Sequence, residues 1–199
     1  MTRKLFLIAG LIYSLNITNV SAQISFGINS GLNFTSVSDQ TDEGRWDSGI
    51  GYRIGGYSEI PLGKFGLHFE ADYSNVPING LFNDKVTLHY VSLPVTLFYS
   101  PIRRLKIFAG PEINFLIGQS GPEYQPSFGE EDGFKKLDYG AHVEIEFIAT
   151  KRLGISIRNY FGLQYNREIH PPRAQSGTGL NKLNIFGLGV NYSFTKSRG

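Results

Sequence analysis

Apolar and polar residues alternate along most of this chain. In the first run, Ile24, Phe26 and Ile28 are separated by Ser25 and Gly27. Successive side chains of a β-strand point to opposite faces, so this period of two predicts a strand. Helical periodicity is absent after residue 22. The sequence therefore predicts an all-β protein whose eight strands lie within residues 24–34, 50–55, 67–74, 91–99, 105–115, 136–147, 153–158 and 184–194.

The connections between these segments alternate in length. Tight turns at about residues 61–65, 100–104 and 150–152 are interspersed with long polar stretches at about 35–48, 75–85, 118–135 and 164–181. With an even number of strands, both ends of the barrel segment lie on the side of the short turns. Short periplasmic turns and long extracellular loops are typical of barrels in the bacterial outer membrane. We therefore expect an eight-stranded antiparallel up-and-down transmembrane β-barrel.

Alternation alone does not say which face is inside. A soluble lipocalin-like barrel in the periplasm, binding a hydrophobic ligand, also has one apolar and one polar face. Eight strands with about five apolar positions each give about forty side chains, more than the interior of an eight-stranded barrel holds. We therefore predict that the apolar face contacts lipid, and keep the soluble barrel as the alternative.

The beginning of the chain differs from the rest. Arg3 and Lys4 precede an apolar run of about eleven residues, and Val20-Ser21-Ala22 is typical of a signal-peptidase site. We predict a signal peptide at 1–22, the barrel at 23–194 and a short extension at 195–199, in the outer membrane of a Gram-negative bacterium. Without Arg3 and Lys4, the 19 Lys and Arg residues become 17 and equal the 17 Asp and Glu residues, so no nucleic acid partner is expected. The absence of Cys excludes disulfides and thiolate metal sites.

Charged residues occupy the polar positions of several strands. His68, Glu70 and Asp72 share one face, as do His142, Glu144 and Glu146. Two imidazoles with four carboxylates suit a divalent metal such as Zn or Mn. The favoured interpretation is instead a paired polar network without cofactor, because buried charges persist when they are paired. The predicted network consists of Arg53, His68, Glu70, Asp72, Lys106, Glu112, His142, Glu144, Glu146 and Arg158.

Two other functions are conceivable for such a barrel, an ion gate and a lipid-modifying enzyme. An ion gate would have Glu112, Glu144 and Glu146 switch between Arg53 and Arg158, but an eight-stranded lumen is usually occluded. A lipid-modifying enzyme would need a histidine with serine and acid partners. The candidates His89 and His170 have none at local spacing, although Ser176 and Glu168 are near His170 in sequence. We therefore expect no enzymatic activity.

The long loops are the expected functional surface. Trp46, Tyr124 and Phe128 are candidate aromatic anchors for an extracellular or envelope protein, and Glu130, Glu131 and Asp132 form an acidic cluster nearby. The alternative is a set of solvated loops without a partner.

Short motifs in fixed order suggest a family. They are Tyr90-Val91-Ser92-Leu93-Pro94, Gly110-Pro111, Asp138-Tyr139-Gly140, the run from Arg158 to Leu163, Gly187-Leu188-Gly189 and Tyr192-Ser193-Phe194. In these motifs the chain resembles the PorT-like outer-membrane β-barrel family of Bacteroidota, over essentially all of residues 23–194.

The resemblance implies an eight-stranded barrel in the lipid bilayer of the outer membrane, and one branch of the family is linked to protein secretion. Such barrels commonly end on an aromatic residue that the barrel-assembly machinery reads, whereas Thr195 to Gly199 follow Phe194 here. The expected function is a structural or interaction role through the extracellular loops, linked to secretion or envelope maintenance.

Overall fold

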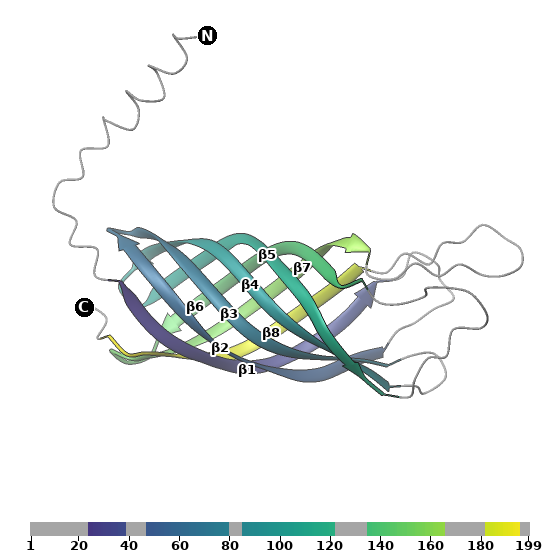
Figure 1. Cartoon of the computed structure of the whole chain (residues 1–199). Helices are drawn as coiled ribbons and strands as arrows, with labels where there is room; N and C mark the ends of the chain where they lie inside the picture. The colour runs from purple at the N-terminus through teal and green to yellow at the C-terminus, as the bar shows by residue number, and fades with distance from the viewer. Residues whose placement is uncertain (1–23, 39–46, 80–84, 122–134, 166–181, 196–199) are drawn as a thin grey trace, which may run out of the picture.

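Eight strands form a closed barrel in which each strand is antiparallel to both neighbours, and β1 pairs with β8 (Figure 1). This computed structural model describes residues 24–38, 47–79, 85–121, 135–165 and 182–195. The strands are β1 (Ser25–Ser38), β2 (Asp47–Leu62), β3 (Phe65–Asn79), β4 (Lys85–Ile102), β5 (Leu105–Ser120), β6 (Leu137–Ile148), β7 (Leu153–Tyr165) and β8 (Lys182–Ser193). The predicted fold, an eight-stranded antiparallel up-and-down barrel, is confirmed. The predicted signal peptide lies outside the described residues.

The outer surface of the barrel is apolar and its interior is polar. Leu97 is 64% exposed and Ile54 is 58% exposed, whereas Arg53 and Asp72 are almost completely buried. A protein in water has the opposite distribution, because burial of apolar surface drives its folding. The apolar face is therefore the one that contacts lipid, as the size of the interior predicted. Among the described residues, no helix is long and apolar enough to cross a membrane.

The strands are longer than a bilayer requires. They have 12 to 18 residues, whereas a tilted strand crosses the hydrocarbon region in about 9–11. The long-loop ends of β3, β4, β7 and β8 carry their apolar side chains on the inner face. The buried cluster there consists of Val76, Ile78, Leu88, Tyr90, Tyr160, Leu183 and Ile185, and we call it the apolar plug.

The plug corrects one prediction from the sequence. Residues 75–85 were expected to form a loop, but β3 continues to Asn79 and β4 begins at Lys85. At this end the neighbouring side chains of Asn75 and His89 point outward, so the apolar side faces in and the polar side faces out. Beyond the hydrocarbon region the outer surface meets water, and this reverses which face has to be apolar.

Candidate functional site

Arg158, on β7, is the centre of the polar network inside the barrel. Its Nη2 lies 2.6 Å from Glu70 Oε2, its Nη1 lies 3.0 Å from Asp72 Oδ2, and its Nε lies 3.2 Å from Glu144 Oε2. Glu70 and Asp72 are on β3 and Glu144 is on β6, so this guanidinium links β3 and β6 to its own strand, β7. All four side chains are nearly inaccessible to solvent. Buried charges are tolerated when they are paired and hydrogen-bonded, so these groups depend on one another.

Arg53, on β2, is a second guanidinium beside the same carboxylates. Its Nη1 lies 3.7 Å from Glu70 Oε1 and 3.9 Å from Asp72 Oδ2, and its side chain is 1% exposed. Gly189 leaves room for this side chain, because a Cβ at that position would overlap Nη2 of Arg53. Asn29 donates to both Glu70 and Asp72 from β1. Two cations therefore face the two carboxylates of β3 at the middle of the barrel.

His142 connects this centre to the part of the interior below the apolar plug. Its Nδ1 lies 2.7 Å from Glu112 Oε2, and its Nε2 lies 3.4 Å from Glu144 Oε2. Nearby, Tyr160 of the plug donates a hydrogen bond of 2.8 Å to Asp138. The imidazole thus bridges two carboxylates from β5 and β6.

His68 and Lys106 extend the network toward the short-turn end. His68 Nδ1 lies 3.3 Å from Glu59 Oε1, and its Nε2 lies 3.7 Å from Glu70 Oε2. Lys106 Nζ lies 2.7 Å from Glu59 Oε2 and 3.8 Å from Glu146 Oε2. Ionic contacts therefore run without a break from Glu146, near one end of the barrel, to Glu112, below the plug.

The structure places all ten predicted network residues inside the barrel, and each has an ionic contact with another member or with Glu59. Glu59 itself was missed, although it is 6% exposed and shares the parity of Arg53 along β2. Apolar residues stop alternating there because Gly56 and Ser58 occupy the outward positions. Extending the predicted strand 50–55 by four residues, with the same alternation of inward and outward positions, would have placed Glu59 inside the barrel.

The interior also brings together a three-residue group with the chemistry of a metal site. Glu70, His142 and Glu144 each offer one ligand atom, and these three atoms lie within 4.8 Å of one another. The guanidinium of Arg158, however, already contacts both carboxylates. A metal ion would compete with that cation, so we interpret the group as part of the ion-pair network.

Metal analysis tests this interpretation. We expect protein that has been purified, exposed to a chelator and dialysed to contain no stoichiometric divalent metal. Its resistance to unfolding should be unchanged when zinc or manganese is added back. Retention of one metal ion per chain, lost in a Glu144→Gln variant, would contradict the interpretation.

A small polar cluster lies on the outer surface near the long-loop end. His89 Nδ1 lies 2.6 Å from the hydroxyl of Tyr73, and its Nε2 lies 3.0 Å from Ser120 Oγ. His89 therefore has a serine partner 31 positions away, which local spacing in the sequence does not reveal. The second nitrogen of the ring contacts a phenol where a hydrolase has a carboxylate that orients the imidazole. We interpret the cluster as a set of hydrogen bonds across β3, β4 and β5.

A serine-directed probe distinguishes the two interpretations of this cluster. We expect a fluorophosphonate to leave Ser120 unlabelled in the folded protein, because an unactivated hydroxyl is a weak nucleophile. Mass spectrometry of the peptide that contains Ser120 measures the modification, and a Ser120→Ala variant gives the background. Labelling that disappears in a His89→Gln variant would indicate an activated serine.

Comparisons with known proteins agree with this architecture. The sequence model of the outer membrane protein beta-barrel domain matches residues 18–166, about three quarters of the chain. The chain belongs to this family. No curated protein matches the sequence.

Several solved structures are similar to this chain at low sequence identity. Neisserial surface protein A, from Neisseria, is 12% identical with a TM-score of 0.56, and the match covers 85% of this chain and 97% of that one. OprG from Pseudomonas aeruginosa is 11% identical with a TM-score of 0.49, covering 85% and 95%. Ail from Yersinia pestis, solved with the heparin analogue sucrose octasulfate, is 11% identical with a TM-score of 0.49, covering 86% and 99%.

Membership in this family of outer-membrane barrels places the protein in the outer membrane. The apolar outer surface then lies in the bilayer, and from the general topology of such barrels we expect the short-turn end to face the periplasm. The candidate anchors Trp46, Tyr124 and Phe128 lie outside the described residues, as do His170, Ser176 and Glu168. A partner bound by these loops therefore stays a prediction.

Proposed function

We propose that this protein is a sealed, non-enzymatic barrel that anchors its four extracellular loops in the outer membrane and presents them to a protein of the envelope or the cell exterior. The observation that carries the proposal is the filled interior. Ion pairs around Arg158 occupy the middle of the barrel, and the apolar plug occupies its outer part. A sealed barrel leaves the loops as its main means of contact with the exterior.

The shape of the interior also weighs against the ion-gate hypothesis. Glu144 contacts Arg158 at 3.2 Å and Glu112 contacts His142 at 2.7 Å, so two of the proposed gating carboxylates are engaged in short contacts. An ion that passed a gate formed by these carboxylates would still be blocked by the buried side chains of Leu88 and Val76, which are 1% and 0% exposed. Movement of the carboxylates alone would not open that path.

Within this proposal, the protein is a PorT-like barrel of Bacteroidota with a role in secretion or envelope maintenance. The motifs of that resemblance supply parts of the interior, because Arg158 centres the network and Asp138 accepts the hydrogen bond of Tyr160. We also propose that the barrel-assembly machinery inserts the protein. The backbone of Phe194 supports this, since its N–H donates to Phe26 O at 2.8 Å and continues β8 alongside β1.

Loop replacement with crosslinking tests the proposal. Each long loop is replaced in turn by a Gly-Ser segment of equal length, and intact cells are treated with a membrane-impermeant crosslinker. We expect one replacement to abolish recovery of a specific partner while the barrel keeps its heat-dependent gel mobility. Replacing Arg104 in the periplasmic β4–β5 turn serves as control. Equal recovery from all loop variants would overturn the interaction role.

A further inference from the structure

The periplasmic end of the barrel contains a cavity of about 590 Å³. This volume lies within the range of roughly 300–1,000 Å³ that is typical of small-molecule sites. The side chains of Tyr57, Phe98 and Leu153 form an apolar part of its wall. The cavity is independent of the extracellular loops and therefore of the function proposed above.

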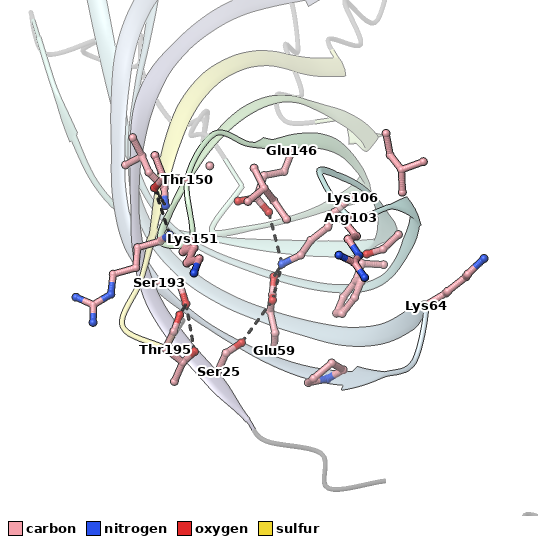
Figure 2. A pocket seen from close by; sticks show the side chains of 18 of the residues that line it. Ser25, Glu59, Lys64, Arg103, Lys106, Glu146, Thr150, Lys151, Ser193 and Thr195 are labelled. Carbon is pink, nitrogen blue, oxygen red and sulfur yellow. Dashed lines mark hydrogen bonds and ion pairs between the residues drawn. The ribbon is translucent and has the colours of Figure 1, made fainter. Parts of the chain in front are cut away.

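The floor of the cavity is a cluster of charged side chains in mutual contact. Lys106 Nζ donates to both oxygens of Glu59, at 2.9 and 2.7 Å, and lies 3.8 Å from Glu146 (Figure 2). Ser25 adds a hydrogen bond of 3.5 Å to the outer oxygen of Glu59. Glu59 also lies 3.3 Å from His68 Nδ1, so the two carboxylates of the floor are shared between one lysine and one imidazole.

The entrance of the cavity is cationic. The three periplasmic turns, at residues 63–64, 103–104 and 149–152, contain five Lys and Arg residues and no Asp or Glu. Of these, Lys64, Arg103, Lys151 and Arg152 line the cavity. Figure 2 shows Arg103 and Lys151 near the opening and Lys64 directed away from it. Within the described part of the chain, neither Arg103 nor Lys151 has a salt bridge.

We propose that this cavity binds a small anionic solute of the periplasm, with its phosphate or carboxylate held at the cationic entrance by Arg103 or Lys151 and its apolar part against Tyr57 and Phe98. Guanidinium and ammonium groups recognise such oxygens by charge-assisted hydrogen bonds. The partly enclosed wall reduces the solvent screening that weakens exposed ion pairs. The anionic group comes either from a free solute or from the headgroup of an inner-leaflet phospholipid.

The experiment uses phenyl phosphate as the free probe and the full-length protein in a phospholipid-free nonionic detergent. Amide shifts of Gly63 and Gly154, which line the cavity, report binding by solution NMR. A second arm compares nanodiscs of phosphatidylcholine with nanodiscs that also contain phosphatidylglycerol. The test variant is Arg103→Gln with Lys151→Gln, and the matched control is Arg104→Gln, a neighbouring cation that does not line the cavity.

We expect saturable binding whose Kd rises about tenfold in the double variant and less than about twofold in Arg104→Gln. Binding of phenyl phosphate in detergent identifies a free solute as sufficient. A lipid headgroup is identified if the shifts appear only with phosphatidylglycerol. These shifts should then be lost in the double variant and kept in Arg104→Gln. Absence of saturable shifts in both arms, or equal loss in both variants, overturns the proposal. Heat-dependent gel mobility of each variant shows that the barrel has folded.

Discussion

Replacing Arg158 with glutamine is expected to lower the free energy of unfolding by about 3–5 kcal/mol, the usual cost of removing one partner from a buried ion pair. The substitution leaves Glu70, Asp72 and Glu144 close together with Arg53 as the remaining guanidinium beside Glu70 and Asp72. Urea titration in lipid, followed by the folded band in an unheated gel, measures the change.

Two further variants show whether charge or shape causes the loss. Arg104→Gln removes an exposed guanidinium in the β4–β5 turn and is expected to change stability by less than about 0.5 kcal/mol. Adding Glu144→Gln to Arg158→Gln removes one uncompensated carboxylate and should recover part of the stability. A loss below about 1 kcal/mol for Arg158→Gln would mean that the network does not hold the barrel together.

Replacing Val143 with lysine is expected to destabilise the inserted barrel by about 2–4 kcal/mol, because a cation on the lipid-facing surface near the bilayer midplane loses its hydration. Val143 is the central outward position of β6 and is 39% exposed. The same urea titration in lipid measures the effect.

Depth provides the matched control for this substitution. Leu62 is also exposed to lipid but ends β2 at the periplasmic turn, so Leu62→Lys should cost only about 0–1 kcal/mol. Equal destabilisation by Val143→Lys and Leu62→Lys would show that Val143 does not lie deeper in the hydrocarbon region than Leu62.

The sequence predicted the fold and the network because lipid imposes one simple rule on the strands. Where the outer face meets hydrocarbon, every second residue is apolar, and parity then assigns residues such as Asp72 and Arg158 to the interior. The rule holds only at the depth of the bilayer. It fails at Val76 and Leu88, where the outside is aqueous and the pattern of the strand inverts.

The His89 cluster shows a second limit of sequence reasoning. A register shift lies between His89 and Tyr90, so that His89 pairs with Gly118 while Tyr90 pairs with Leu116. The residue left unpaired is Ile117, and this bulge reverses the faces that follow it. Ser120 consequently points outward toward His89. Simple parity along β5 would have put Ser120 inside the barrel, and the contact joins residues 31 positions apart.

Single-channel recording in a planar lipid bilayer tests most directly whether the barrel is sealed. With purified, heat-modifiable protein in concentrated potassium chloride, the filled interior predicts no conductance steps above the bilayer background in either polarity. Discrete, reproducible steps whose size changes in Arg158→Gln or in Leu88→Ala would contradict the sealed barrel, because they would show that ions pass through the network and the plug.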